Sequence, residues 1–251
     1  MAELDGWIFA LAILATLFAG ISKGGFGSGA AFASTSILAL VLEPGQALAL
    51  MLPLLMLMDV TALAPYWQKW SWPDARVMIL GALPGVALGV WLFRVADADL
   101  LRLLIGIMSI AFVVWQMARS RGLVRGFASR LPAWAGVLAG TVSGFTSFVS
   151  HAGGPPAAVY LLSQNLTKIQ YQSTTVILFW AVNIAKVVPY AFLGLFTLEI
   201  AIADLMLAPA AIIGVWLGVH AHRMVSERTF FAITYVVLCL TGAKLIWDGV
   251  G

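Results

Sequence analysis

The sequence predicts an all-α polytopic membrane protein, built from two inverted-topology repeats that each combine a glycine-broken helical hairpin with three transmembrane helices. Three observations lead to this prediction. Of the 251 residues, 62% are hydrophobic and only 10% are charged, against about 25% charged in a typical soluble domain. The apolar residues form long runs, without the alternation of a membrane β-barrel. Two of these runs contain glycine-rich breaks. No soluble core could bury this much apolar surface, which excludes soluble enzymes, nucleic-acid-binding modules and disordered proteins.

Each transmembrane helix is predicted from an apolar run of adequate length, since a crossing needs about 20 residues. The uninterrupted runs are residues 46–67, 76–93, 100–118, 171–196, 201–219 and 229–247. Residues 7–42 and 131–163 are interrupted at 20–29 and 150–156, so that each region gives two arms of about 13 to 17 residues. Such arms are short for a full crossing and favour a broken or re-entrant hairpin, with two tight spans as the alternative.

The two halves of the chain align at a nearly constant offset. Gly27-Ser28-Gly29 matches Gly153-Gly154-Pro155 at an offset of 126 residues, and Pro84 matches Pro209 at an offset of 125. This regularity predicts a first membrane repeat over residues 1–118, a basic cytoplasmic linker over 119–130 and a second repeat over 131–251, together forming one integral membrane domain.

The distribution of basic residues predicts the topology. The linker carries Arg119, Arg121, Arg125 and Arg130, and such clusters stay on the cytoplasmic side. Counting spans from the linker places nine of the fourteen basic residues inside. Each half then has an odd number of crossings. The halves are therefore expected to be inverted, with both chain termini outside.

Three charged residues lie within the apolar runs, where each charge costs at least ~2.5 to 3.5 kcal/mol and therefore marks a candidate functional site. Lys23 is in the first break, Asp59 in the run 46–67 and Lys186 in the run 171–196. Asp59 and Lys186 are one residue from equivalence in the repeat, so a two-fold axis in the membrane plane would bring them together at the midplane. Two interpretations remain open. They form a neutral pair joining two helices, or Lys186 faces a substrate anion while Asp59 tunes it or carries a proton.

The glycine-rich breaks predict the other half of an anion site. Backbone N–H groups at a restarting helix lack partners and carry partial positive charge, and glycine lets an anion approach them. We expect Gly27–Gly29 and Gly153–Pro155 to present such donors. Hydroxyl groups that could add donors are those of Ser28, Ser34, Thr35, Ser150, Thr174 and Thr175. The alternative is that these glycines serve only tight helix packing, the role expected for Gly81, Gly85 and Gly89 and for Gly136, Gly140 and Gly144.

Two further polar residues accompany the candidate site. Asn183 lies one turn before Lys186 and shares its helix face, where it could orient a substrate. His151 directly precedes the second break, and it is expected either to contact or titrate with an anion or to serve a structural role. No catalytic residue, metal site or cofactor is expected. Cys239 is the single cysteine, and Gly20-Ile-Ser-Lys-Gly24 fits the G-x-S-x-G hydrolase pattern without its preceding strand.

Three segments resemble the TauE/SafE sulfite exporter family. They are Gly20–Gly29, Ala152-Gly-Gly-Pro-Pro-Ala-Ala-Val-Tyr-Leu-Leu162 and Asn183-Ile-Ala-Lys-Val-Val-Pro189. The similarity extends over essentially the whole chain and implies a bacterial cytoplasmic-membrane transporter that exports sulfite, thiosulfate or organosulfonates such as sulfoacetate. The first repeat departs from the pattern, because Ser28 stands where family members often have glycine and Ser34 where a proline is usual. This departure bears on substrate size or shape at that arm.

The resulting hypothesis is a secondary transporter for small sulfur-containing anions that works by alternating access. Lys23 and Lys186 would compensate the anion's charge, while Asn183 and His151 would orient it. The alternatives are an anion channel of the same architecture and an intramembrane enzyme that uses His151 with Ser150 or Ser22. Expected partners are the small anion and the lipid bilayer, with a homodimer as an open alternative and no nucleic acid.

Overall fold

Every element in the part of the chain described by the computed structural model is a helix, which confirms the all-α prediction. The structure describes residues 6–26, 30–63, 67–123, 129–221 and 226–251. The elements are α1 (Gly6–Ile21), the π-helical turn η1 (Ser22–Phe26), α2 (Ala33–Leu38), α3 (Pro44–Leu63), α4 (Trp72–Val95), α5 (Ala98–Ser120), α6 (Ala133–Ser150), α7 (Gly154–Ser163), α8 (Lys168–Phe192), α9 (Leu198–Ala221) and α10 (Glu227–Val250).

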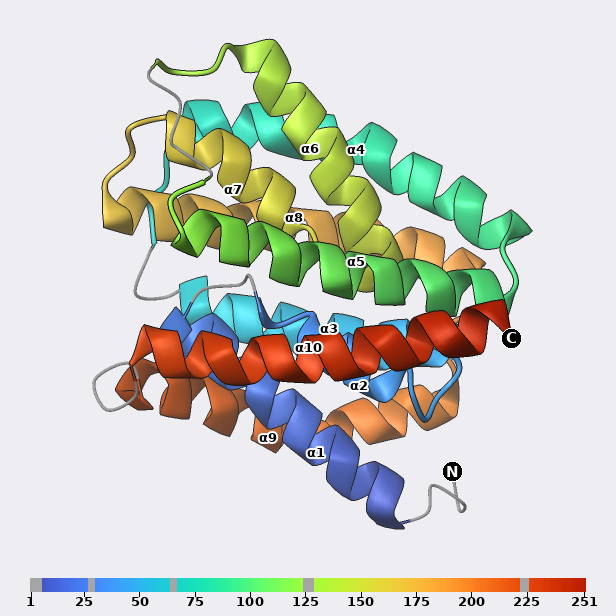
Figure 1. The fold of residues 1–251 in the computed structure, drawn as a ribbon. Coiled ribbons are helices and arrows are strands. Elements are labelled where there is room, and N and C mark those ends of the chain that lie inside the picture. The colour runs from blue at the N-terminus through green and yellow to red at the C-terminus, as the bar shows by residue number, and fades with distance from the viewer. Residues whose placement is uncertain (1–5, 27–29, 64–66, 124–128, 222–225) are drawn as a thin grey trace.

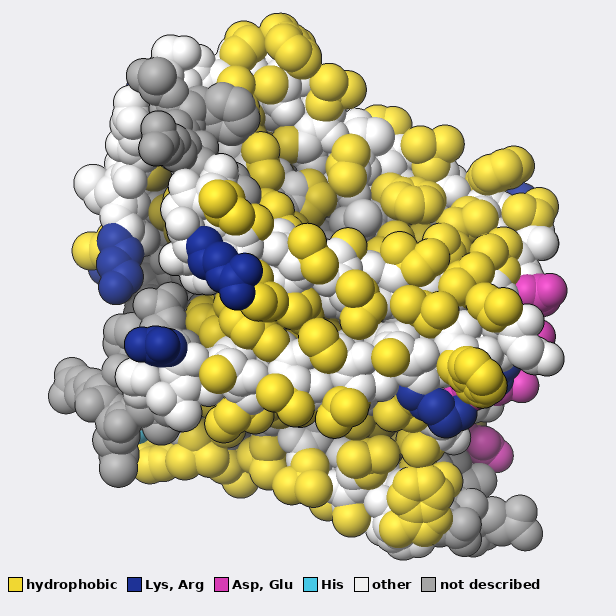
Figure 2. All heavy atoms as spheres, in the orientation of Figure 1, with side chains coloured by type: hydrophobic (Ala, Val, Ile, Leu, Met, Phe, Trp, Pro, Cys, Tyr) yellow, Lys and Arg dark blue, Asp and Glu magenta, His cyan; other side chains and the backbone are white. Residues whose placement is uncertain are grey.

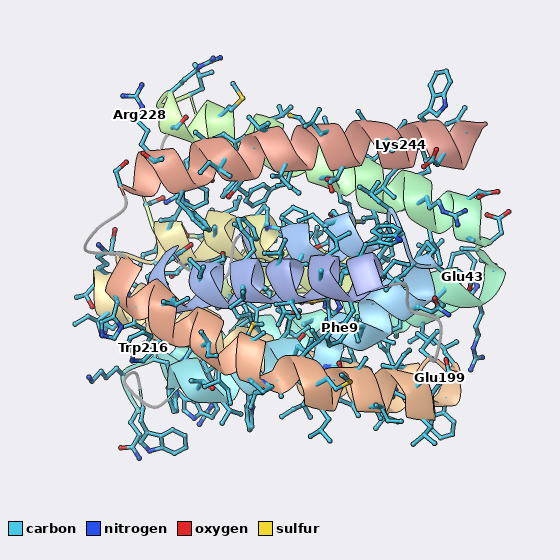
Figure 3. The ribbon with its side chains drawn as sticks, turned by 90° about the horizontal axis from the view of Figure 1, so that it is seen from below. Phe9, Glu43, Glu199, Trp216, Arg228 and Lys244 are labelled. Atoms are coloured by element: carbon cyan, nitrogen blue, oxygen red, sulfur yellow. The ribbon has the colours of Figure 1, made fainter. Side chains whose placement is uncertain are left out.

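The helices form a bundle with a membrane protein's surface. Seven are long and apolar enough to cross a bilayer: α1 continued by η1, α3, α4, α5, α8, α9 and α10. In Figure 1 the start of α1 and the end of α10 lie at the same end of the bundle. Figure 2 shows a largely hydrophobic face between the two ends. Figure 3 places Arg228 at one end, called here the basic end, and Glu43 and Glu199 at the opposite end. This is the charge pattern of a polytopic membrane protein.

The six uninterrupted runs all form helices, with ends that differ from the predicted ones by a few residues. Helix α8 begins at Lys168 instead of 171, because Thr167 and Gln170 form a capping box that starts the helix. It ends at Phe192 instead of 196, since Gly194 adopts a left-handed φ of 70°. The two ends of α8 are therefore determined by local capping, which the hydrophobic pattern alone does not reveal.

The two interrupted regions form unequal arms, so the predicted length of about 13 to 17 residues fits α1 but is wrong for α2, α6 and α7. In the second region α6 has 18 residues and α7 only 10, and α7 turns back from the end of α6 (Figure 1). Ten residues rise only about 15 Å, half of the hydrocarbon layer, which favours a re-entrant hairpin over two spans. In the first region α1 has 16 residues and α2 only 6, and residues 27–29 of the break lie outside the described residues. The first arms are long because α1 packs along α9 and α6 along α4.

Glycines allow the closest helix contacts, as predicted. A Cβ added to Gly85 of α4 would lie 2.0 Å from the carbonyl oxygen of Thr141 on α6. One added to Gly144 of α6 would lie 2.3 Å from that of Ala82 on α4. The α1–α9 contact has the same character, because a Cβ on Gly218 would lie 2.4 Å from the carbonyl oxygen of Ile21. Backbones that approach this closely leave space for glycine alone.

The two halves of the chain are interleaved through these contacts. Helix α4 of the first half packs on α6 of the second, and α9 of the second half packs on α1 of the first. Helices α3 and α8 contact each other, as do α5 and α10. The α4–α6 and α1–α9 pairs are therefore counterparts with the halves exchanged, and much of the packing lies between the halves.

Substituting Gly85 with alanine is expected to lower the thermal unfolding temperature in detergent, with a loss of about 3 kcal/mol, because the new methyl group pushes α4 away from α6. Gly6→Ala is the matched control, since no atom lies within 4 Å of a Cβ at that position. Equal unfolding temperatures for the two variants would contradict this role of Gly85.

Candidate functional site

Three charged side chains are buried at the centre of the bundle. Lys23 of η1, Asp59 of α3 and Lys186 of α8 are only 6%, 2% and 0% exposed. Burying a charge is costly unless a partner compensates it. The partners of each group therefore determine what this centre can bind.

Lys23 and Asp59 form an ion pair, in which the Lys23 ammonium donates to Asp59 Oδ1. Asn183 Nδ2 donates to the other carboxylate oxygen, Oδ2, at 2.8 Å, and Lys23 also donates to the Leu55 carbonyl at 3.2 Å. Of the two interpretations left open for Asp59 and Lys186, the neutral pair between them is not formed, because Lys23 takes that place. The wider turn of η1 changes the direction of the residues that follow α1 and presents Lys23 to α3.

Lys186 binds uncharged partners. Its Nζ lies 3.0 Å from the Ser147 carbonyl oxygen, 3.1 Å from Ser147 Oγ and 2.8 Å from His151 Nδ1. His151 Nε2 lies 3.1 Å from the Leu48 carbonyl oxygen. Because a carbonyl can only accept, Nε2 carries the proton, and Nδ1 of the neutral ring accepts from Lys186. No carboxylate among the described residues forms an ion pair with Lys186. With both amines protonated, the centre carries two ammonium groups and one carboxylate.

A small central cavity of about 20 Å³ lies between these two networks. Its lining includes Lys23, Asn183, His151 and Ser147, together with Phe179 and Gly154. This volume holds about one water molecule. An oxyanion with several heavy atoms can therefore enter only if the surrounding helices separate.

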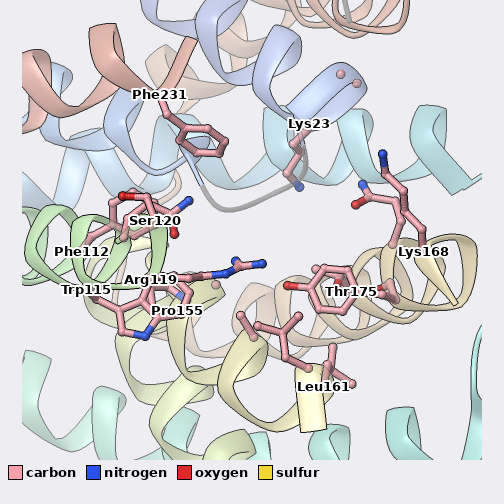
Figure 4. A pocket seen from close by; sticks show the side chains of 18 of the residues that line it. Lys23, Phe112, Trp115, Arg119, Ser120, Pro155, Leu161, Lys168, Thr175 and Phe231 are labelled. Carbon is pink, nitrogen blue, oxygen red and sulfur yellow. Dashed lines mark hydrogen bonds between the residues drawn. The ribbon is translucent and has the colours of Figure 1, made fainter. Parts of the chain in front are cut away.

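A much larger vestibule leads to the same place from the basic end. It has a volume of about 1570 Å³, and Figure 4 shows Lys23 among the side chains that surround it. Lys23 and Gly154 line both the vestibule and the central cavity. The described lining contains no Asp or Glu, and its cationic residues are Lys23, Arg119, Arg121, Lys168 and Arg228. The vestibule therefore favours anions along its whole depth.

The second glycine break lies at the vestibule and the central cavity, but one of its predicted backbone donors is wrong. Gly153 caps α7, Gly154 is its first residue, and the N-terminus of α7 carries partial positive charge. Pro155 was predicted to supply a backbone donor, but proline has no N–H, and its role here is to line the vestibule. Gly153 has a packing role as well, since a Cβ there would lie 2.6 Å from the Phe179 ring. The corresponding Gly27, Ser28 and Gly29 lie outside the described residues.

None of the predicted hydroxyl donors among the described residues lines the central cavity. Thr174 Oγ1 accepts from the backbone N–H of Ser71 at 2.9 Å, and Thr175 lines the vestibule. Ser34 donates to the Ala15 carbonyl at 2.6 Å, which ties α2 to α1. Ser150 and Thr35 are also buried in the helix packing. Hydroxyl groups on apolar helices satisfy nearby carbonyls first, so a Ser or Thr in such a sequence is a weak signal.

Two contributors were missed from the sequence. Ser147 binds Lys186 through both its carbonyl and its hydroxyl, and its position four residues before His151 on one helix face could have indicated this. Arg119 was interpreted only as a topology signal, although it lines the vestibule. Arg119 lies four residues after Trp115, so both side chains are on one helix face. This spacing could have indicated that the guanidinium packs over the Trp115 ring.

Comparison with known proteins places the chain in a family. The model of the family described as Sulfite exporter TauE/SafE matches residues 12–245, nearly the whole chain, including both glycine-rich breaks and all the charged residues of the centre. No curated protein and no solved structure matched the chain. Because the match covers far more than half of its length, this chain belongs to the TauE/SafE sulfite exporter family.

Proposed function

We propose that this protein is a secondary transporter that exports small sulfur-containing anions, namely sulfite, thiosulfate or organosulfonates such as sulfoacetate, across the bacterial cytoplasmic membrane. One observation carries the proposal. The buried Lys23–Asp59 pair lies at the inner end of a vestibule whose described lining contains no Asp or Glu, and the nearby buried amine of Lys186 has no carboxylate partner among the described residues. A chain of this family with such a centre has the charge to hold one anion.

The chemistry of the centre suits an oxyanion. The ammonium groups of Lys23 and Lys186 and the amide of Asn183 are donors, and the oxygens of sulfite and sulfonates are acceptors. An entering anion would compensate the excess positive charge and accept hydrogen bonds that now go to neighbouring carbonyl and imidazole groups. The N-terminus of α7 would contribute partial positive charge from the second half.

Alternating access is supported by the exchange of contacts between the halves. The pairing of α4 with α6 and of α9 with α1 is the pattern that a two-fold axis in the membrane plane would produce. With the basic end in the cytoplasm, the vestibule would open inward and both termini would lie outside. Outward movement of one negative charge is then favoured by ~2.3 kcal/mol per 100 mV of inside-negative potential.

The test is efflux of sulfite, thiosulfate, sulfoacetate, taurine and sulfate from proteoliposomes that contain the purified protein. We expect saturable efflux of at least one sulfite-like or sulfonate anion, accelerated by an inside-negative potential, and accumulation of labelled substrate by counterflow. Failure of all five anions to move would contradict the proposal. Non-saturable flux without counterflow would instead support an anion channel.

A further inference from the structure

We propose that the vestibule contains a second anion site, centred on Arg119, which receives the substrate before it reaches Lys23 and Lys186. The inference rests on the proposed function and adds a binding site to it. Its ligand class is a sulfonate or a related oxyanion, which can present two oxygens to a guanidinium group.

Arg119 is held in place by aromatic neighbours. Its guanidinium carbon lies 5.7 Å from the centroid of the Trp115 ring, one turn earlier on α5. The phenol of Tyr171, on α8, interacts with the same guanidinium. Figure 4 shows Arg119 extending from its helix across the vestibule. A guanidinium that stacks on one face keeps its N–H edges available, and little conformational freedom is lost when an anion binds them.

Arg119 forms no ion pair with any carboxylate in the part of the chain that the structure describes. The described vestibule lining contains Arg121, Lys168 and Arg228 in addition to Arg119 and Lys23, but no carboxylate. Arg102, at the other end of the same helix, forms an ion pair with Asp99, and Lys244 forms one with Asp248. Arg102 and Lys244 thus have acidic partners, while the described lining of the vestibule offers Arg119 no carboxylate and leaves it for an external anion.

The surroundings of Arg119 also suit the organic part of a sulfonate. Phe112, Trp115 and Phe231 line the vestibule beside it. A short carbon chain would contact these rings while the sulfonate group binds the guanidinium. We therefore expect this outer site to prefer an organosulfonate such as sulfoacetate to sulfite, although both carry the group that Arg119 recognises.

The experiment compares Arg119→Gln and Arg119→Lys with Arg102→Gln, which removes an arginine from the opposite end of the same helix. Sulfoacetate transport is measured in proteoliposomes sorted so that the basic end faces the substrate. Loss of a charged hydrogen-bond donor is expected to raise the half-saturating concentration roughly tenfold in Arg119→Gln, with the maximal rate unchanged. Arg119→Lys should show a smaller rise, and Arg102→Gln none.

Equilibrium dialysis with labelled sulfoacetate tests the site without transport. We expect two anions bound per chain in the wild-type protein and one in Arg119→Gln. A single bound anion in the wild type, or a half-saturating concentration in Arg119→Gln equal to that of Arg102→Gln, would overturn the inference. A protein that binds two anions but transports none would leave the outer site standing and contradict the proposed function instead.

Discussion

Replacing Lys186 with methionine is expected to reduce anion efflux at least about 100-fold while the protein stays folded. The substitution keeps the length of the side chain and removes the ammonium group that has no carboxylate partner among the described residues. Ser147 loses two hydrogen bonds and His151 one, but the cost of burying an uncompensated charge is removed as well. Efflux from proteoliposomes measures the loss of transport. Thermal unfolding in detergent shows whether the variant is still folded.

Lys244→Met is the matched control, because this lysine forms an exposed pair with Asp248 at the far end of α10. Its efflux should equal that of the wild type. Undiminished efflux in Lys186→Met would show that Lys186 does not bind the anion. Its buried position would then have only a structural role.

Replacing Asp59 with alanine is expected to destabilise the protein by about 3–5 kcal/mol, because Lys23 would keep a buried charge without its anionic partner. The amide of Asn183 also loses its acceptor. Chemical unfolding in detergent gives the free energy of unfolding of the variant and of the wild type.

The double variant Lys23→Met with Asp59→Leu separates stability from function. Replacing both charges by apolar groups should restore most of the lost stability, since no charge is then left unpaired. Efflux should stay at background, because the centre has lost the cation that lies between vestibule and central cavity. Full activity in the double variant would show that the pair has only a structural role.

Much of the fold follows from hydrophobic pattern and helix propensity. The runs around Asp59 and Lys186 became α3 and α8, and the glycines of α4 and α6 lie at close helix contacts as predicted. The lengths of α2 and α7 did not follow, because they depend on the space left inside the bundle. Sequence periodicity describes a helix and its faces, but not the room that other helices leave for it.

The members of the central site were predicted better than their pairing. Lys23, Asp59, Asn183, His151 and Lys186 all lie in the two central networks. The alignment of the repeats placed Asp59 opposite Lys186, yet η1 brings Lys23 to Asp59. A π-helical turn changes which direction a side chain faces by a fraction of a turn, and no hydrophobic pattern records that change.

A structure of the protein determined with selenite, the selenium analogue of sulfite, tests the central claim most directly. Its anomalous signal locates the anion without ambiguity. We expect a selenium peak between α3, α6 and α8, with an oxygen about 2.8 Å from Lys186 Nζ and the central cavity enlarged around it. Selenium peaks confined to the protein surface, with the central cavity still closed around Lys23 and His151, would contradict this account.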